Sequence, residues 1–417
     1  MTWSNWFCIF VIIATVWALL KRYESRLVLL AAGFLMAIVC GDPLEAFHQF
    51  DKSMTNGGLI VSICSAMGFA AVISITHCDD HLIRLLIAPL GKLGFFLMPA
   101  CMVVTSVLFT AIPTLSGLGA AIGPTLIPLL IRSGFSPACA ASVVVGSSLA
   151  GYLSPGTAHN VFVAQISSMD VMTFLFSHAM KTISIVGLCI FGVCLTCWLM
   201  KDYQKQSDQK TSNNDLIGKP KLSYAITPLL PITILVVSAI WFPEMKLSVA
   251  SAMIIGATYA FLITRKNPAE AVTEFFKGMG RGYASILGII IAAGVFAAGL
   301  RAGGLIDTFV NYLTNSNEVA SLGATIGPYL MGVITGSGDA AAFAFNEAVT
   351  PHAESFGLSI PGLGYLAMMS AALGRLSSPL AGGTILLAGI ACTSPMEVVK
   401  RTVPTGLVVL VVLYFVA

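Results

Sequence analysis

One arginine and one aspartate lie in apolar stretches of this sequence, where charged side chains are rare. Arg375 follows a long apolar run, and Asp339 follows a Gly-Ser-Gly cluster. A guanidinium inside a membrane span is costly unless an anion pairs with it, and its planar fork fits a carboxylate in bidentate fashion. We therefore expect Arg375 to bind a carboxylate of a substrate. The alternative is a structural ion pair with Asp339 or Glu347.

Two segments combine a Ser/Gly cluster with a proline-containing apolar helix. They read IPTLSGLGAAIGPTLIPLLIRSGFSP at 112–137 and ITGSGDAAAFAFNEAVTPHAESFGLSIP at 334–361. Glycine lets the backbone turn tightly and leaves amide groups free to meet a ligand. We interpret the surrounding segments, 95–132 and 321–351, as re-entrant hairpins that enter the membrane halfway and return. Their tips carry four substrate-binding candidates: Ser116, Gly117, Ser337 and Gly338.

Each hairpin precedes a predicted span, at 140–166 and at 364–390, that a Ser-Pro pair interrupts. The pairs are Ser154-Pro155 and Ser378-Pro379. Proline removes a backbone donor and frees a carbonyl one turn back, so an apolar helix unwinds there. The half-helices that follow direct their positive dipole ends at the membrane midplane, where they favour a carboxylate. The substrate-binding candidates in these spans are Ser154, Thr157, Asn160, Arg375, Ser377 and Ser378.

The residues that would handle a coupling ion are less clearly marked. Asp339 binds a cation, carries a proton or balances the charge of Arg375, and the sequence leaves all three open. Asn346 and Glu347 follow about two turns later, where helix packing or capping explains them equally well. Thr114, beside the first Ser/Gly cluster, is a further candidate, and His159 is a candidate proton carrier. The pattern predicts Na⁺ near the hairpin tips, with ligands unassigned, or H⁺.

The composition indicates a membrane protein. Apolar residues make up 57% of the 417 residues, charged residues make up 10%, and the mean hydropathy is +0.89. The net charge of +3 is too small to indicate nucleic-acid binding. The sequence contains no GxxxxGK[ST], GxSxG or HExxH motif. Direct ATP use and an intramembrane enzyme are therefore disfavoured, and we expect no cofactor.

The sequence repeats itself at half its length. DPLEAFHQFDKSMTNGG at 42–58 matches NPAEAVTEFFKGMGRGY at 267–283, an offset of 225 residues (267 − 42), with seven of the 17 positions identical. This similarity predicts two copies of one unit, a plan that is common in secondary transporters. The first copy would cover 1–200 with an arm helix at 42–57. The second would cover 222–417 with an arm helix at 267–282.

The predicted fold is an all-α polytopic membrane protein with two inverted-topology repeats, about ten spans and two re-entrant hairpins. An odd number of crossings per repeat gives the second copy the opposite orientation. The long hydrophilic segment at 201–221 joins the repeats and carries five lysines and three aspartates. Basic loops stay in the cytoplasm, so we expect the linker there and both termini in the periplasm.

With these residues in view, the chain resembles the DcuC-type C4-dicarboxylate carriers, within the wider group of elevator-type ion transporters. The similarity covers nearly the whole length. It is clearest at SGLG (116–119), MGVITGSGD (331–339), LGRLSSP (373–379) and SPMEVVKRTVP (394–404). The resemblance implies a multi-pass carrier of the bacterial inner membrane for dicarboxylates such as fumarate and succinate. It also implies a scaffold domain, a mobile transport domain and a homodimer.

The sequence therefore predicts a secondary active transporter of small organic anions, foremost C4-dicarboxylates such as fumarate, succinate and malate. Uptake, exchange or efflux would proceed by elevator-type alternating access, coupled to Na⁺ or H⁺ or to exchange against a second dicarboxylate. The substrate and the lipid bilayer are the expected partners. The alternative is an ion-coupled amino-acid or peptide transporter, in which Asp339 binds an ammonium group and Arg375 binds a carboxylate.

Overall fold

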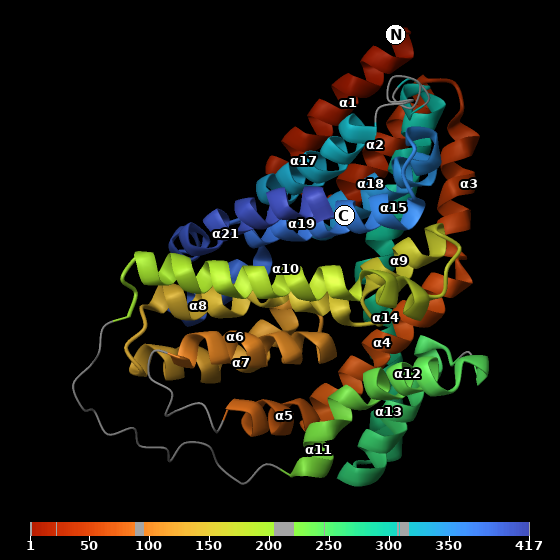
Figure 1. Ribbon diagram of the computed structural model, residues 1–417. Helices are drawn as coiled ribbons and strands as arrows, with labels where there is room; N and C mark the ends of the chain where they lie inside the picture. The colour runs from red at the N-terminus through yellow and green to blue at the C-terminus, as the bar shows by residue number, and fades with distance from the viewer. Residues whose placement is uncertain are drawn as a thin grey trace.

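The computed structural model describes residues 2–416 except 22, 88–95, 204–220, 246, 307 and 309–316. Over these residues the chain is helical, with one isolated antiparallel bridge between Phe135 and Tyr203 (Figure 1). The predicted linker at 201–221 falls almost entirely outside the described residues. The first residue of the hairpin predicted at 95–132 is outside them as well.

The helices of the first half are α1 (Trp3–Leu20), α2 (Ser25–Val39), α3 (Pro43–Met54), α4 (Gly57–Thr76), α5 (Cys78–Ile87), α6 (Leu97–Ala111), α7 (Leu115–Arg132), α8 (Pro137–Gly146), the 3₁₀ turn η3 (Ser148–Leu153), α9 (Ala158–Ile166) and α10 (Val171–Leu199). Those of the second half are α11 (Leu222–Ile226), η4 (Thr227–Leu229), α12 (Leu230–Trp241), η5 (Pro243–Met245), α13 (Val249–Thr264), α14 (Pro268–Gly282), η6 (Tyr283–Leu287), α15 (Gly288–Ala302), α17 (Asn317–Thr335), α18 (Gly338–Ala348), η7 (Thr350–Phe356), α19 (Ile360–Leu376), α20 (Gly382–Ile390) and α21 (Pro395–Val416).

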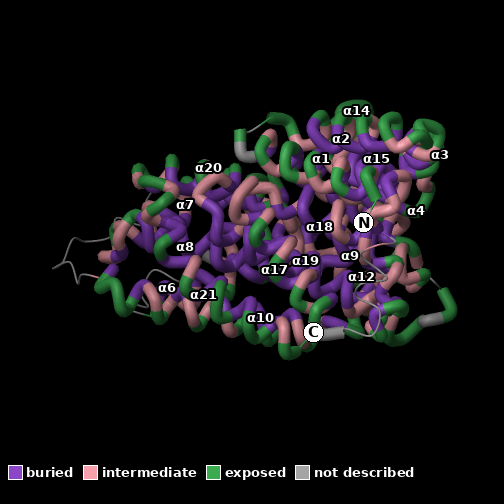
Figure 2. Tube along the Cα trace, turned by 90° about the horizontal axis from the view of Figure 1, so that it is seen from above, coloured by how far each residue is buried: buried purple, intermediate pink, exposed green. Residues whose placement is uncertain are grey.

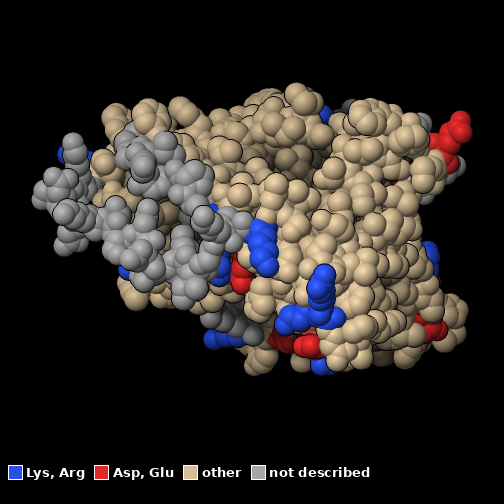
Figure 3. Space-filling model, turned by 90° about the horizontal axis from the view of Figure 1, so that it is seen from below, with Lys and Arg blue, Asp and Glu red and all other residues tan. Residues whose placement is uncertain are grey.

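Seven helical segments of the described chain are long and apolar enough to cross a membrane, and five further apolar helices are shorter. The shorter group includes α2 and α13. The long group includes α7, which the sequence predicted as one limb of a hairpin. On the face shown in Figure 3, Lys, Arg, Asp and Glu are few: several lie near its centre and lower edge, others lie at its two sides, and most of the described part of that face is made of other residue types.

The helices pack as two groups. In the scaffold group (α1–α5 and α11–α15), α2 packs on α15, and α4 packs on both α13 and α14. In the hairpin group (α6–α10 and α17–α21), α17 and α18 pack on α19, and α10 packs along α21. The two groups meet where α18 contacts α15 and where α9 contacts α4. Figure 2 shows buried residues running through this middle region, where α9, α18 and α19 lie.

The predicted arm helices begin alike. Asp42 accepts a hydrogen bond from the Glu45 amide at the start of α3, and Asn267 accepts one from the Ala269 amide at the start of α14. A proline follows each capping residue, at the helix position that needs no amide donor. The matching sequence therefore produces matching helix starts.

The arm helices end differently. After α3, Asn56 starts the separate helix α4 by accepting a hydrogen bond from the Leu59 amide. Arg281 occupies the aligned position in the second segment (281 − 225) and offers no such acceptor. There α14 continues through the π-helical turn η6 into α15, as one helical segment of 35 residues. The segment 267–282 is thus the first part of a long helix, where the sequence predicted a separate arm.

Glycines permit two close crossings in the scaffold group. A Cβ atom on Gly33 of α2 would lie 2.5 Å from the Val295 carbonyl oxygen of α15, and one on Gly299 would lie 2.5 Å from the Gly33 carbonyl oxygen. A Cβ atom on Gly278 of α14 would lie 2.5 Å from the Met67 carbonyl oxygen of α4. Small residues let membrane helices pack backbone against backbone in this way.

We expect Gly33→Ala to destabilise the protein, because the Val295 carbonyl belongs to a rigid backbone and cannot move aside. Overpacking by one methyl group costs about 1–3 kcal/mol and lowers the apparent Tm in detergent. Gly187→Ala in α10 is the matched control, since a Cβ atom there meets nothing within 4 Å. Equal Tm values for the two variants would contradict the close crossing.

Candidate functional site

A cavity of about 530 Å³ lies between the scaffold group and the hairpin group. The hairpin group contributes the turns α6–α7 and α17–α18 and the interrupted parts of α8–α9 and α19–α20. The scaffold group contributes α4, α13 through Met253, and α14 through Arg281. The lining residues with polar side chains are Ser74, Asp79, Thr114, Ser116, Tyr152, Ser154, Thr157, His159, Arg281, Ser337, Asp339 and Arg375.

Four helices of the hairpin group begin at this cavity. The first turns of α7, α9, α18 and α20 contribute to its wall Ser116-Gly117, Ala158-His159, Gly338-Asp339 and Gly382-Gly383. The first backbone amides of a helix have no partner within the helix, and the macrodipole adds partial positive charge there. Four such ends around one space make the cavity favourable for an anion.

Local sequence explains why helices start here. Pro155 and Pro379 follow the ends of η3 and α19, and Pro113 precedes α7. Gly336 lies before α18 with a φ of +71°, a conformation that favours glycine. A Cβ atom on Gly336 would lie 2.6 Å from the Leu380 carbonyl carbon, so the second hairpin turn packs directly on the interruption between α19 and α20.

Asp339 is the centre of a charged cluster in the cavity. Its Oδ1 lies 3.2 Å from Arg375 Nη1 and 3.0 Å from His159 Nε2. The Arg375 and His159 side chains are 19% and 7% exposed, whereas that of Asp339 is 45% exposed. Asp339 lies in the first turn of α18 and Arg375 in the last turn of α19, the ends at which a helix favours an acid and a base. Both members of the ion pair line the cavity, so a ligand can reach them.

His159 is held by aromatic stacking. Its ring centroid lies 4.4 Å from that of Phe343 and 5.4 Å from that of Tyr152. Its Nε2 faces Asp339, and its buried Nδ1 has no hydrogen-bond partner among the described residues. We assign a proton to Nε2, which faces the Asp339 carboxylate, because a proton on Nδ1 would be buried without an acceptor. His159 then donates to Asp339 and fixes that carboxylate beside Arg375.

Most of the predicted site residues come together at this cavity. The substrate-binding candidates that line it are Ser116, Gly117, Ser154, Thr157, Ser337, Gly338 and Arg375, and the coupling-ion candidates that line it are Thr114 and Asp339. Thr157 Oγ1 also donates to the Gly151 carbonyl at 2.6 Å, so this hydroxyl helps to hold the interrupted helix.

The other three substrate-binding candidates lie behind the cavity wall and satisfy backbone or side-chain partners. Asn160 Nδ2 donates to two carbonyls of the interrupted segment, at 2.8 and 2.9 Å. Ser378 Oγ donates to the Val333 carbonyl at 2.7 Å, and Ser377 Oγ accepts from the Tyr329 hydroxyl at 3.2 Å. Inside a membrane an unwound backbone needs such internal partners, so these residues stabilise the interruptions.

Asn346 and Glu347 lie further along α18, outside the cavity wall. The Asn346 side chain is fully buried, and its Oδ1 accepts from Thr350 Oγ1 at 2.8 Å. Glu347 Oε1 accepts from Gln49 Nε2 at 3.1 Å, and Gln49 Oε1 accepts from Arg301 Nη2 at 3.0 Å. Glu347 therefore connects α18 to the scaffold helices α3 and α15.

Four polar lining residues were not singled out in the sequence: Ser74 of α4, Asp79, Tyr152 and Arg281. Tyr152 lies two residues before the Ser154-Pro155 pair, so its position near that interruption was a usable signal. Asp79 begins α5, and Arg281 lies in α14. Both reach the cavity through the packing of the scaffold helices, for which the sequence contains no local signal.

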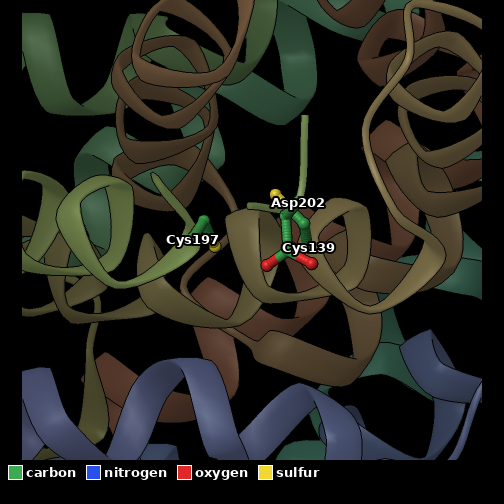
Figure 4. A group of neighbouring side chains, drawn as sticks. All are labelled: Cys139, Cys197 and Asp202. Atoms are coloured by element: carbon green, nitrogen blue, oxygen red, sulfur yellow. The ribbon is translucent and has the colours of Figure 1, made fainter. Parts of the chain in front are cut away.

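Cys139, Cys197 and Asp202 place their sulfur and carboxylate atoms within 4.8 Å of one another (Figure 4). Asp202 is already engaged, because Arg401 Nε and Nη2 donate to its two oxygens at 2.7 and 2.6 Å. Ser136 Oγ donates to Oδ1 at 2.7 Å as well. The side chains of Asp202 and Arg401 are 5% and 7% exposed. Through Asp202, Arg401 of α21 is connected to the end of α10 and, by way of Ser136, to the start of α8.

Comparison with known proteins identifies the family. A sequence model of the C4-dicarboxylate anaerobic carrier family, DcuC, matches residues 35–417. The chain belongs to this family. It is 29% identical to the anaerobic C4-dicarboxylate transporter DcuC of Escherichia coli K12, over 86% of this chain and 81% of the relative. It is 44% identical to a transporter of Haemophilus influenzae named as uncharacterized, over 60% of this chain and 95% of the relative.

A solved structure shares the fold. The crystal structure of the Alcanivorax borkumensis YdaH transporter matches with a TM-score of 0.59 and 16% identity, over 89% of this chain and 86% of that chain. The DcuC resemblance indicated by the sequence motifs is confirmed. The family and its named relatives are transporters rather than enzymes, and with the long apolar helices this makes the chain a multi-pass protein of the bacterial inner membrane.

We expect Asp202→Asn to destabilise the DcuC-family fold strongly. Removing one partner of a buried ion pair costs about 3–5 kcal/mol, because Arg401 is then buried without its anion. The double variant Asp202→Leu/Arg401→Met should lose less stability, since it leaves no unpaired charge. Thermal unfolding in detergent compares the two, and a double variant less stable than Asp202→Asn would contradict this account.

Asp79 should make ligand binding depend on pH. Burial, and then the neighbouring Asp80 carboxylate, raise the pKa of Asp79 to about 6, and this residue lies outside the membrane-spanning helices. A raised pKa keeps the carboxyl neutral below that pH, so Asp79 repels an anion in the cavity only above it. We expect Asp79→Asn to bind succinate a few-fold more tightly than wild type at about pH 7.5, and equally at about pH 5.

Calorimetric Kd values for wild type and Asp79→Asn at both pH values check this expectation. Ionisation of succinate itself affects both proteins equally and cancels in the ratio of the two Kd values. A ratio that does not change with pH would exclude a titrating Asp79 from the cavity.

Proposed function

We propose that this chain is a secondary active transporter of small organic anions, foremost C4-dicarboxylates such as fumarate, succinate and malate. The observation that carries the proposal is the meeting of four helix N-termini and the Arg375 guanidinium at one cavity. Backbone amides, helix dipoles and a guanidinium fork all favour carboxylates. Membership of the C4-dicarboxylate anaerobic carrier family supports the same class of substrate.

In this proposal one substrate carboxylate competes with Asp339 for Arg375. The ligand would replace one carboxylate by another, so the half-buried guanidinium keeps an anionic partner throughout. The first-turn amides of α18 and α20 would donate to the substrate oxygens. Further hydroxyl donors on the cavity wall are Ser116, Ser154 and Ser337.

We further propose that the hairpin group carries the cavity past the scaffold group, which is elevator-type alternating access. The position of the cavity between the two groups supports this mechanism. The packing supports inverted repeats: α2 packs on α15 as α13 packs on α4, and α3 packs on α15 as α14 packs on α4. In each of these pairs a helix of one repeat packs on a helix of the other, and the equivalent helices form the reverse contact. Reciprocal packing of this kind is typical of transporters that are built from two repeats.

The driving force in this proposal is a Na⁺ or H⁺ gradient, or exchange against a second dicarboxylate. Asp339 is the proposed coupling residue, since it is the acid that contacts both Arg375 and His159. The proposal includes a cytoplasmic linker at 201–221, periplasmic termini and a homodimer formed through the scaffold group.

A second candidate is an amino-acid or peptide transporter. One observation favours it: among the described residues, two carboxylates, Asp79 and Asp339, line the cavity together with two guanidinium groups, Arg281 and Arg375. A balanced set of charges suits a zwitterion. The two candidates differ in whether an ammonium group on the ligand improves binding.

Uptake of labelled succinate into proteoliposomes loaded with fumarate tests the proposal. We expect uptake by the wild type and a loss of about tenfold or more in Arg375→Ala, because a buried charge contact to the substrate is removed. Arg132→Ala is the control, since Arg132 is exposed at the end of α7 and does not line the cavity.

Na⁺ and proton gradients imposed one at a time identify the coupling ion, and exchange alone would leave uptake insensitive to both. Uptake of labelled amino acids but of no dicarboxylate, by a folded preparation, would overturn the dicarboxylate proposal in favour of the second candidate.

A further inference from the structure

We propose that Arg281 of α14 is a second carboxylate-binding residue of the cavity, and that it makes the protein select dicarboxylates over monocarboxylates. This inference rests on the proposed function. It assigns the two carboxylates of one substrate to opposite walls: Arg375 on the hairpin group binds one, and Arg281 on the scaffold group binds the other.

The charges on the cavity wall distinguish the two arginines. Arg375 is paired with Asp339 at 3.2 Å and is 19% exposed. Arg281 also lines the cavity, is exposed, and makes no side-chain hydrogen bond or ion pair with the described residues. In the proposed function a substrate displaces Asp339 from Arg375, whereas Arg281 offers its five donors without displacing a protein partner.

The local backbone turns Arg281 toward this space. Arg281 and Ile286 both line the cavity although they are five residues apart, a spacing that an α-helix of 3.6 residues per turn places on different faces. The π-helical turn Tyr283–Leu287 begins two residues after Arg281 and contains Ile286. Bonding from i to i+5 widens the turn and brings such residues to one side, and π-turns of this kind are frequent at functional sites.

The first half of the chain has a helix boundary at the position where the second half has Arg281 and the π-helical turn. Asn56 occupies the position of Arg281 in the first half, where its side chain accepts a hydrogen bond from the Leu59 amide and starts α4. In the second half the helix continues, and the residue at that position carries a guanidinium into the cavity. The difference between the two halves thus adds a cation to one wall only.

The ligand chemistry follows from this arrangement. A dianion with two separated carboxylates can contact both arginines, while a monocarboxylate can contact only one. We expect a monocarboxylate to bind at the Arg375 end, where the first-turn amides of α18 and α20 add donors, so Arg281 should contribute to the KM for dicarboxylates and little to the binding of monocarboxylates. Arg281 takes no part in holding the hairpin group together. We therefore expect Arg281→Gln to change the turnover rate little.

Transport kinetics of Arg281→Gln in proteoliposomes test the inference. We expect the KM for succinate to rise about tenfold with Vmax within about twofold, and the inhibition constant of monomethyl succinate to stay unchanged. Arg281→Lys should recover most of the succinate affinity, because it restores the charge. Lys277→Gln is the matched control: Lys277 is exposed on the same helix, pairs with Glu274 at 2.6 Å and does not line the cavity.

The outcomes separate the inference from the proposed function. If wild type transports succinate and Arg281→Gln leaves its KM unchanged, or weakens monomethyl succinate equally, the inference is wrong and the proposed function stands. If wild type transports no dicarboxylate, both are wrong. Purified variants are compared by thermal unfolding, and equal losses of Tm and of succinate affinity in Arg281→Gln and Arg281→Lys would also overturn the inference.

Discussion

Four helix N-termini and one half-buried guanidinium concentrate positive charge inside a membrane protein, and an anion must compensate this charge. Asp339 is the resident anion: it lies in the first turn of α18, pairs with Arg375 and accepts from His159. The exposure of the pair is unequal, since Asp339 is more than twice as exposed as Arg375. In the proposed function a ligand replaces this anion, whereas the arginine and the helix ends stay in place.

The helix ends are fixed by polar side chains that serve the backbone. Asn160 and Thr157 donate to carbonyls freed in the first interrupted helix, and Ser378 donates across to a carbonyl of α17 next to the second interruption. Without such bonds the unwound segments would leave unsatisfied polar groups in an apolar surrounding. Stability and the proposed ligand recognition thus use neighbouring residues of the same short motifs: Asn160 and Ser378 lie behind the cavity wall, and Thr157 holds the backbone while it also lines the cavity.

Much of this arrangement could be predicted from local sequence, because proline and glycine act locally. Both Ser-Pro pairs lie where helices are interrupted, and both Ser/Gly clusters lie at turns that open into the cavity. The sequence could not separate Ser154, on the wall, from Asn160, behind it, since both follow from one motif. Nor could it place Arg281 or direct Glu347 toward α3, because both positions depend on tertiary packing of the scaffold helices.

The most direct test of the central claim is an experimental structure of the protein with succinate bound. The account predicts one succinate carboxylate on the Arg375 guanidinium and close to the first turns of α18 and α20, with Asp339 displaced from its 3.2 Å contact. Succinate bound elsewhere, with the Asp339–Arg375 pair intact, would contradict the account.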